Sequence, residues 1–552
     1  MIKADLEALV QAAVVKAQAA GELAPVPVPP GVIERPQRPE HGDYACSLPL
    51  RLARAARAAP LDIANAIVRH IAPVDWLAAV ETAPPGFINF RLAESWLALQ
   101  VVQILAEGDA FGDVPVGKGE RVQVEFVSAN PTGPLTVASG RGLAIGDTLA
   151  SVLSAAGYSV EREYLINDAG TQTETFASTL LARYQQLFGR QVEVPPGAYV
   201  GEYMLEIARE VKDEFGDGFL DRGDGAYPPE LHDIGIQKML GRIQEDLGAI
   251  RVRYDSWFSE RSLYDSGAYE KSMSLLREKG YVKEKENAVW FTSTALGEDK
   301  DNVLVRSSGK PTYFASDIAY HYDKFVSRGF RRVIDIWGAD HQGHVPRMKA
   351  AVAALGVDPA LLTIIIHQLI TLRRGDEEVR LSKRAGDIIT LREVVDEVGA
   401  DAARFFFVTR APQSHMDFDL ELASRQSNEN PVYYVQYAHA RITGILNHSR
   451  ERIASFEDGD VSLLVHEAEL ALVRKLLQFP EVIEEIAQSL EPHPLPYYAL
   501  ELATTFHDFY ERCRVVSDDV PLSKARLKLV AAAKVALARA LGLMGMTAPE
   551  HM

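Results

Sequence analysis

The stretch 121–166 constrains the fold of this 552-residue chain more than any other part of it. Residues 121–127 alternate and include β-branched and aromatic side chains, which predicts a strand. A loop over 128–140 and a helical pattern over 141–156 follow, and a second strand is predicted over 160–166. Strand, loop, helix and strand in this order form one unit of a parallel α/β sheet. We therefore expect an α/β domain around such a sheet.

The rest of the chain divides around this unit. The β/α pattern resumes near 332–337 and 362–367, whereas 190–300 is acidic and glycine-rich and reads as an irregular insertion in the sheet domain. After about Gly399 the strand signals vanish and helical patterns follow one another, which predicts an all-α bundle. At about 150 residues per domain, the length suggests three or four domains. The predicted division is a mixed α+β domain over 1–112, the sheet domain over 113–398 and the bundle over 399–552.

The composition is that of a globular protein, with 47% hydrophobic and 24% charged residues. Two cysteines, Cys46 and Cys513, are too few for a disulfide framework or a thiolate metal cluster, which favours a reducing, cytoplasmic location. No run approaches the roughly 18 apolar residues that span a bilayer, so no membrane partner is expected. The net charge of −18, from 58 Lys and Arg against 76 Asp and Glu, argues mildly against a nucleic-acid partner.

Three loops carry residues suited to phosphate chemistry. The first, 130–142, is glycine-rich and joins a predicted strand to a helix, where backbone N–H groups and the helix dipole can face an anion. A tight turn without a ligand fits that pattern equally well. The second, 380–387, is basic and suits a clamp for polyphosphate, although a solvated basic turn is the more common outcome. The third, 337–344, follows a strand at the carboxyl edge of the predicted sheet, where ligands bind.

The third loop contains two histidines, His341 and His344, which are candidate metal ligands by residue type. Asp340 is the only other plausible ligand nearby, and no cysteine is close. Zinc sites in proteins need three or four such ligands. We therefore expect ordinary hydrogen-bonding histidines and predict no protein-held metal.

Taken together, these loops resemble the nucleotide signatures of class I aminoacyl-tRNA synthetases, and further segments narrow the resemblance to the arginine–tRNA ligase family. The segments that carry it occur in order along nearly the whole chain, at 41–45, 85–90, 125–135, 167–172, 313–321, 399–405 and 430–441. The resemblance implies a Rossmann-like α/β catalytic domain with insertions, an appended α+β N-terminal domain that binds tRNA, and an all-α anticodon-binding bundle.

The same resemblance implies the ATP-dependent attachment of L-arginine to its cognate tRNA. The arginine carboxylate attacks the ATP α-phosphate, giving arginyl-adenylate and pyrophosphate, and a terminal ribose hydroxyl of tRNA then takes the arginyl group and releases AMP. Mg²⁺ is expected with ATP, held largely by phosphate and water. Family members typically need bound tRNA before they activate arginine. The implied partners are arginine tRNA, arginine and ATP, and the chain is expected to be a monomer.

Site residues are carried over from the family position by position. A guanidinium needs converging acids, and the residues expected to bind arginine are Glu125, Asn130, Tyr313 and Asp317. Taken singly, each acid would be a solvated surface carboxylate and the tyrosine core packing. The residues expected to bind ATP are Gly133, Gly140, Arg141, Gly338, Asp340, His341, Ser382 and Lys383. Of these, Arg141 is expected at the helix N-terminus that meets the phosphates, and Lys383 is expected to neutralise pyrophosphate. The expected catalytic residues are Lys383, Thr136 and Ser139.

One segment departs from the family pattern. The family has His-x-Gly-His where this chain has Thr136, Val137, Ala138 and Ser139, so both imidazoles that hydrogen-bond the ATP phosphates are missing. Losing a charge-assisted contact costs about 1–3 kcal/mol, or about one to two decades in rate. Two alternatives follow: a tRNA-binding paralogue with impaired catalysis, and a synthetase of this class for another amino acid. The residues that weigh against both are Lys383, Glu125, Asn130, Tyr313 and Asp317.

Contacts with tRNA are expected in the C-terminal region. Residues 524–539 carry five Lys and Arg and no acid, with apolar residues at helical spacing, so one face is basic; a solvated charged face is equally compatible. Tyrosines near the start of the bundle are candidates for stacking on anticodon bases, with burial in the bundle as the alternative. The expected tRNA-binding residues are Tyr433, Tyr437, Lys524 and Lys528. Since the region from Asp401 onward holds 15 Lys and Arg against 21 Asp and Glu, nonspecific RNA binding should be weak.

Overall fold

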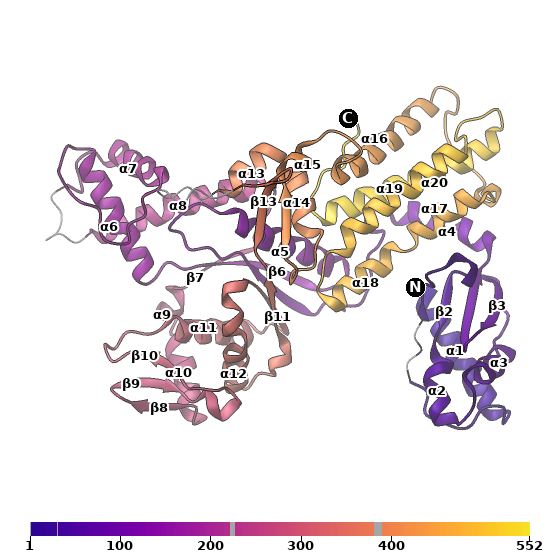
Figure 1. Ribbon diagram of the computed structural model, residues 1–552, viewed down its shortest axis with the longest axis horizontal. Helices are drawn as coiled ribbons and strands as arrows, with labels where there is room; N and C mark the ends of the chain where they lie inside the picture. Colours follow the sequence, from indigo (N-terminus) through magenta and orange to yellow (C-terminus); the bar gives the residue numbers. More distant parts are fainter. Residues whose placement is uncertain (1, 30, 32, 221–226, 380–388) are drawn as a thin grey trace.

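The computed structural model describes residues 2–29, 31, 33–220, 227–379 and 389–552. An N-terminal α+β part, a central part around a parallel sheet and a C-terminal set of helices are arranged in that order along the chain (Figure 1). The N-terminal part has an antiparallel sheet of order β1-β2-β4-β3, formed by β1 (Ile33–Glu34), β2 (Tyr44–Cys46), β3 (Leu77–Ala83) and β4 (Phe87–Leu92). Its helices are α1 (Ile2–Ala19), α2 (Leu48–Ala56) and α3 (Pro60–Arg69), and α4 (Glu94–Glu107) leads out of it.

The central sheet has five strands in the order β12-β11-β5-β6-β7, and all neighbouring pairs are parallel. The strands are β5 (Arg121–Phe126), β6 (Ser159–Ile166), β7 (Ser256–Ser259), β11 (Arg332–Gly338) and β12 (Leu362–His367). Four of them were predicted from the sequence and are confirmed to within one residue at either end. The strand order reverses between β11 and β5, so their carboxyl ends flank the crevice where α/β sheets bind ligands.

The helix that connects β5 to β6 is α5 (Val137–Ala155). The predicted start at residue 141 is therefore wrong, because the helix begins four residues earlier. α5 lies between the sheet and α14 (Ala400–Val408) and is buried along most of its length. Gly146 permits this close approach, since a Cβ there would lie 2.3 Å from Cγ of Phe126.

Most of the described residues in 190–300 form helices and strands, so the prediction that this region is irregular is wrong. This region supplies β7, the edge strand of the central sheet. It also contains α7 (Glu202–Phe215), α8 (Pro229–Ala249), α9 (Ser262–Asp265) and α10 (Ala268–Glu278), while α6 (Thr171–Gln186) precedes it and packs on α7 and α8. These helices are charged on their outer faces and bury only a narrow apolar stripe. In α7 the buried stripe consists of Met204, Ile207, Ala208 and Val211.

A small antiparallel sheet of order β10-β9-β8 lies below the central sheet in Figure 1. Its strands are β8 (Val282–Lys285), β9 (Ala288–Phe291) and β10 (Asn302–Val305). The chain then enters α11 (Tyr313–Tyr322), which continues directly into a π-helical turn, Asp323–Ser327. After β11 comes α12 (Val345–Leu355), which packs beside α10 and α11.

A third small sheet, of order β14-β13-β15, follows β12. Its strands are β13 (Ile370–Arg374), β14 (Glu377–Glu378) and β15 (Met416–Asp419), and its neighbouring helices are α13 (Leu391–Val398), α14 and α15 (Leu420–Ser424). β15 contradicts the prediction that strands end at about Gly399. It is only four residues long, and its pairing with β13 rather than its own pattern makes it a strand.

The remaining chain forms the predicted all-α bundle. Its helices are α16 (Pro431–Ser449), α17 (Glu467–Leu476), α18 (Phe479–Ser489), α19 (Pro494–Arg512) and α20 (Val520–Leu543). α4 packs against α17 and α20 and so attaches the N-terminal part to the bundle. Within the described ranges, no helix combines the length and the apolar character needed to cross a bilayer. The domain boundaries 1–112, 113–398 and 399–552 stay predictions.

Candidate active site

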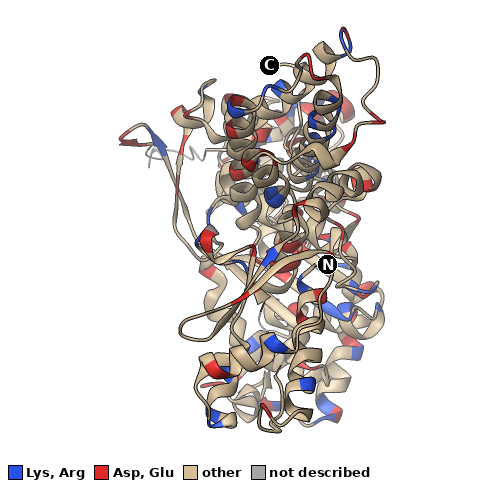
Figure 2. Ribbon diagram, turned by 90° about the vertical axis from the view of Figure 1, so that its right-hand side faces the viewer, with Lys and Arg blue, Asp and Glu red and all other residues tan. Residues whose placement is uncertain are grey.

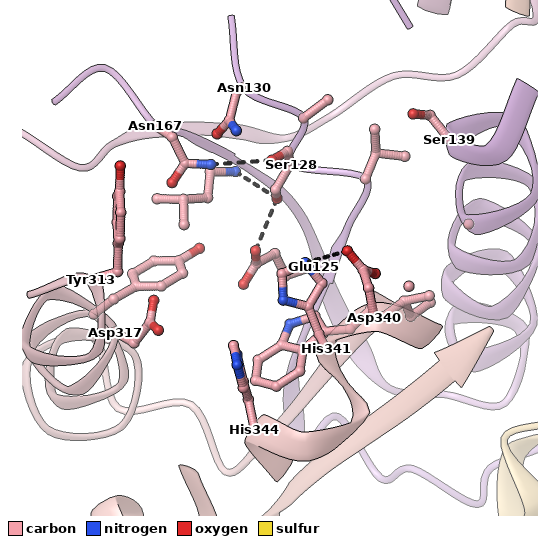
Figure 3. Close-up of a pocket in the computed structure, with 18 of the residues that line it drawn as sticks. Glu125, Ser128, Asn130, Ser139, Asn167, Tyr313, Asp317, Asp340, His341 and His344 are labelled. Carbon is pink, nitrogen blue, oxygen red and sulfur yellow. Dashed lines mark hydrogen bonds and ion pairs between the residues drawn. The ribbon is translucent and has the colours of Figure 1, made fainter. Parts of the chain in front are cut away.

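A cavity of about 530 Å³ opens at the carboxyl edge of the central sheet, at the point where the strand order reverses (Figure 3). Its walls come from the ends of β5, β6, β11 and β12, from the beginning of α5, from one face of α11, and from the turn that precedes α12 together with the start of α12. It brings together most of the residues that the sequence singled out for arginine and ATP. Those that line it are Glu125, Asn130, Ser139, Tyr313, Asp317, Gly338, Asp340 and His341.

The first acid of the cavity, Asp317, lies on α11. Tyr313 and Asp317 are four residues apart and therefore share one helix face. No hydrogen bond or ion pair engages the Asp317 carboxylate within the part of the chain that the structure describes. Burial raises the pKa of Asp317 to about 6, against the opposing charges of His321 and Arg347. A half-buried carboxylate that has no partner among the described residues favours a cationic ligand.

Glu125 contributes the second acid and is already paired. Its Oε2 lies 2.6 Å from Nζ of Lys324, and its Oε1 accepts a hydrogen bond from Ser128 Oγ at 2.9 Å. The backbone after β5 turns sharply to present that hydroxyl, since Val127 and Ser128 have φ angles of 68° and 41°. Such a conformation is rare for a β-branched residue and costs about 1–3 kcal/mol, as strained residues at functional sites do. Asn130 lies at the rim, where its amide donates to Gln172 Oε1 at 2.6 Å.

The first turn of α5 forms another part of the wall. Thr136 is the N-cap residue, and its Oγ1 lies 3.5 Å from Oγ of Ser139. Of the two, Ser139 lines the cavity, whereas Thr136 bridges by its backbone to Thr390. Gly133 lies in the preceding loop, where a Cβ would lie 3.4 Å from the hydroxyl oxygen of Tyr203.

Two residues that were expected to contact the ATP phosphates, Arg141 and Gly140, instead pack against other parts of the chain. Arg141 lies inside α5 and not at its N-terminus, so that prediction is wrong; its buried guanidinium donates to the carbonyls of Gln368 and Ala411 at 2.9 Å each. Gly140 faces the opposite side of the helix, where a Cβ would lie 2.7 Å from Leu391 Cδ1. Both positions join α5 to its packing partners. The next glycine, Gly142, does line the cavity.

The end of β11 leads into a 3-10 turn, Ala339–His344, that carries Asp340, His341 and His344 to the cavity. Nε2 of His341 lies 3.6 Å from Oδ2 of Asp340. Burial lowers the pKa of His344, and the positive charge of Arg347 adds to this effect. No cluster of three metal-ligating side chains occurs in the described residues.

Several cavity residues were missed in the sequence. Arg347 on α12 and His367 at the end of β12 line the cavity, and Tyr320 and His321 continue the helix face of Asp317. Burial lowers the pKa of His367 to about 4, so its imidazole is neutral. Helical spacing from Asp317 is a signal that would have found Tyr320 and His321. The predicted residues Ser382 and Lys383 lie outside the described residues.

The tyrosines expected to meet tRNA lie on α16. The rings of Tyr433 and Tyr437 are stacked, with centroids 6.1 Å apart and planes at 7°. Arg441, one turn further on, lies over the Tyr437 ring at 5.1 Å and over the Tyr510 ring at 5.2 Å. Both Tyr433 and Tyr437 are half-buried. Partly exposed, stacked aromatic and guanidinium planes are surfaces on which unpaired bases stack.

The basic run of α20 is largely neutralised by acids on other elements. The ion pairs join Lys524 to Asp458, Arg526 to Glu469, Lys534 to Glu550 and Arg539 to Asp113. Lys528 is the one cation of the run that has no ion-pair partner among the described residues. Figure 2 shows basic and acidic residues interleaved over the molecule rather than a continuous basic band. The sequence run therefore overstated the positive charge of this face.

Comparisons with known proteins agree with this geometry. A model described as the catalytic domain of class I tRNA synthetases (R) matches residues 229–419. The arginyl tRNA synthetase N terminal domain matches residues 4–92, and the DALR anticodon binding domain matches residues 435–552. With the parallel sheet and the cavity at its switch point, these matches define a class I aminoacyl-tRNA synthetase.

Individual relatives show which family within this class the chain resembles. The chain is 54% identical over 520 residues to the arginine–tRNA ligase of Dehalococcoides mccartyi, covering 94% of each chain. It is 48% identical over 558 residues to that of Heliobacterium modesticaldum, covering 100% of this chain and 99% of the relative. The Thermus thermophilus arginyl-tRNA synthetase shares the fold, with a TM-score of 0.78 over 100% of both chains at 22% identity. The chain belongs to the arginine–tRNA ligase family.

Proposed function

We propose that the cavity at the carboxyl edge of the central sheet binds arginine and ATP for the reaction of this family. As a member, the chain attaches L-arginine to tRNA with the consumption of ATP. The arginine carboxylate attacks the α-phosphate to give arginyl-adenylate and pyrophosphate, and the tRNA ribose then takes the arginyl group while AMP leaves. No protein nucleophile is required, so catalysis rests on positioning and on electrostatic stabilisation of phosphate charge.

The carboxylate of Asp317, which has no hydrogen-bond or ion-pair partner among the described residues, carries the assignment of the arginine subsite. A guanidinium is planar and permanently charged, and it forms charge-assisted hydrogen bonds with a carboxylate. Glu125 supplies the second acid, on the neighbouring wall of the same cavity. Tyr313 flanks the side chain of arginine, and Asn130 at the rim takes its α-amino end.

ATP takes the side of the cavity that lies toward α5 and the Ala339–His344 turn. There the N-terminal N–H groups of α5 and the hydroxyls of Thr136 and Ser139 face the phosphates. The remaining residues proposed to bind ATP are Gly133, Gly338, Asp340 and His341, together with Ser382 and Lys383, which lie outside the described residues. Mg²⁺ enters as part of the ATP complex, coordinated mainly by phosphate and water.

The tRNA extends from this cavity to the bundle. Tyr433 and Tyr437 offer stacking surfaces for anticodon bases, and Lys528 offers a cation that has no ion-pair partner among the described residues. Lys524 is a weaker candidate, because Asp458 holds its ammonium at 2.7 Å. We propose that the chain acts as a monomer in the cytoplasm, which is compatible with its two buried, unpaired cysteines.

Arginine-dependent ATP–pyrophosphate exchange tests this function. We expect exchange with arginine and not with the other standard amino acids, and a requirement for tRNA. Exchange with a different amino acid would contradict the arginine assignment of the cavity. Firm tRNA binding without exchange under any condition would instead identify an impaired paralogue. Nothing in the relatives supports that alternative, since they are arginine–tRNA ligases over nearly their full length.

A further inference from the structure

Three acids lie side by side beneath the proposed arginine subsite. In the central sheet, Asp335 of β11 is paired in register with Glu125 of β5, which in turn is paired with Glu163 of β6. Paired positions in parallel strands point to the same face, so the three carboxylates form a row across the sheet. All three are buried. Such a row can exist in the ionised form only if cations neutralise it; without them, some of the carboxyls would be protonated.

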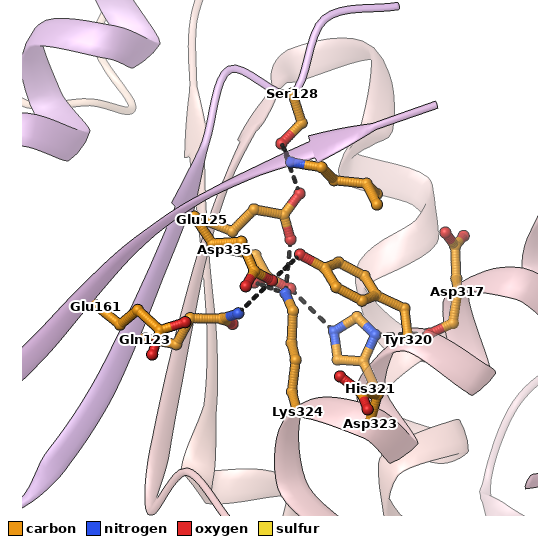
Figure 4. A network of polar contacts seen from close by, with 12 residues as sticks. Gln123, Glu125, Ser128, Glu161, Asp317, Tyr320, His321, Asp323, Lys324 and Asp335 are labelled. Atoms are coloured by element: carbon orange, nitrogen blue, oxygen red, sulfur yellow. Dashed lines mark hydrogen bonds and ion pairs between the residues drawn. The ribbon is translucent and has the colours of Figure 1, made fainter. Parts of the chain in front are cut away.

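The cations come from the end of α11 and the π-helical turn that follows it (Figure 4). Nζ of Lys324 lies 2.6 Å from Glu125 Oε2 and 2.8 Å from Asp335 Oδ1, and it lies 4.0 Å from the centroid of the Tyr320 ring. The Lys324 side chain is fully buried. π-helical turns are rare and occur frequently at functional sites. Here the turn brings the lysine between two acids of neighbouring strands.

The other members of the row have their own partners. Arg328 Nη2 lies 2.8 Å from Glu163 Oε1, and Gln123 donates to the same oxygen at 2.6 Å. Nε2 of His321 lies 2.9 Å from Asp335 Oδ2. The titratable and charged groups that face this network are Asp335, Glu163, Tyr320, His321, Asp323, Arg328, Asp317, Glu161, Tyr254 and Lys349. Lys324 is therefore the one cation in direct contact with Glu125 among the described residues.

We propose that Lys324 is a positioning residue for arginine selection, an internal ammonium that keeps Glu125 ionised and turned toward the cavity. The proposal rests on the assignment of Glu125 to the arginine subsite. Lys324 lies behind Glu125 and is not among the described residues that line the cavity. It consequently acts on arginine through the carboxylate that it holds.

The electrostatics of the pair support this role. Burial raises the pKa of Glu125 above its ordinary value even with Lys324 in contact. Burial disfavours the charged form of Lys324 as well, but Asp335 and Glu125 outweigh it and raise the pKa of Lys324. Removal of the ammonium would leave Glu125 beside Asp335 without a cation, so Glu125 would take up a proton. The cavity would then present one acid fewer to a guanidinium.

The variant Lys324→Met tests the proposal. At pH 7 we expect the KM for arginine in pyrophosphate exchange to rise about 10–100-fold, as for loss of a charged hydrogen-bond partner. The KM should fall back toward the wild-type value as the pH is raised, because Glu125 ionises again. The KM values for ATP and tRNA should stay within about twofold of wild type. Lys324→Gln keeps a donor without the charge, and we expect the same pH-dependent rise if the methionine variant does not fold.

A matched control is Lys212→Met. Lys212 on α7 is half-buried and donates to the carbonyl of Leu187 at 3.0 Å, and among the described residues it contacts no member of the acid row. We expect its substitution to leave the arginine KM and its pH profile unchanged. A change equal to that of Lys324→Met would mean that the effect is one of general destabilisation, and it would overturn the proposal.

The double variant Lys324→Met/Glu125→Gln separates positioning from a direct role. If Lys324 acts through Glu125, then its removal adds little to the arginine KM of Glu125→Gln. Full additivity would overturn the proposal, and so would an unchanged arginine KM in both Lys324 variants. An arginine KM that Glu125→Gln itself does not alter would contradict the proposed arginine subsite instead, so the two failures are distinguishable.

Discussion

The buried guanidinium of Arg404 on α14 forms an ion pair with Asp147 on α5. The same guanidinium donates to the carbonyl of Ile250, at 3.0 Å, and to that of Met544 after α20. Asp147 has a second partner in Arg162 of β6, whose Nε lies 3.0 Å from Oδ1. Arg404 thus ties the helix that begins at the cavity to the end of the tRNA-binding bundle.

Replacing Arg404 by methionine should destabilise the chain strongly. Breaking a buried ion pair by removal of one partner costs about 3–5 kcal/mol, and we expect the lower end of this range because Asp147 keeps Arg162 as a partner. The carbonyls of Ile250 and Met544 also lose their donor. Urea denaturation followed by circular dichroism measures this loss. The exposed pair of Arg392 and Asp396 is the control, since Arg392→Met should cost less than about 1 kcal/mol. Equal losses in the two variants would contradict the importance of the Arg404 junction.

Arginine binding should weaken in acid because of Asp317. Its pKa of about 6 means that a proton competes with the guanidinium below that pH. We expect the arginine KM to be constant above about pH 7 and to rise about tenfold per pH unit well below pH 6. Asp317→Asn should remove this step and raise the KM at pH 8 by about 10–100-fold. A pH profile that the variant leaves unaltered would exclude Asp317 from the subsite.

The same substitution should stabilise the folded chain. Burial raises the folded-state pKa of Asp317 from 3.8 to about 6, so the folded state holds the proton more tightly than the unfolded state. Ionisation therefore costs stability, a cost that develops between about pH 4 and pH 6 and is fully present above. Asp317→Asn should raise the unfolding free energy at pH 8 by about 1–3 kcal/mol and leave it unchanged at pH 3. A loss of stability at pH 8 would contradict a raised pKa of Asp317 in the folded state.

Histidines at positions 136 and 139 should change the rate of arginine activation. Thr136→His/Ser139→His supplies the two imidazoles of the family pattern at the first turn of α5. A gain of charge-assisted contacts with phosphate is worth about 1–3 kcal/mol, or about a 10–100-fold faster step. Single-turnover adenylate formation measures it. An unchanged rate would show that the hydroxyls or other groups already serve the phosphates.

The two lysines of α20 should differ in their contribution to tRNA binding. Lys528→Ala should weaken binding and reduce the slope of log K against log salt concentration by about 1, as for loss of one phosphate contact. Lys524→Ala should have a smaller effect, because Asp458 already occupies its ammonium. Filter binding over a range of salt concentrations compares them. Identical effects would contradict this ranking.

Local pattern predicted much of the fold. The strands β5, β6, β11 and β12 were found because hydrophobic alternation and β-branched runs are local properties of a segment. α7 was missed because its buried stripe is narrow and its other faces are charged. β15 was missed because four residues carry too little pattern, and only pairing with β13 defines it.

The sequence by itself determined the family, the order of the three parts and eight of the residues that line the cavity, because signatures and periodicity are properties of contiguous segments. Only the tertiary structure decided which charges meet. Lys324 and Glu125 are 199 positions apart, and strand register together with the π-helical turn brings them into contact. The same holds for α20, whose basic run is neutralised by acids from distant elements. Charge state and orientation depend on such partners, and no local pattern contains them.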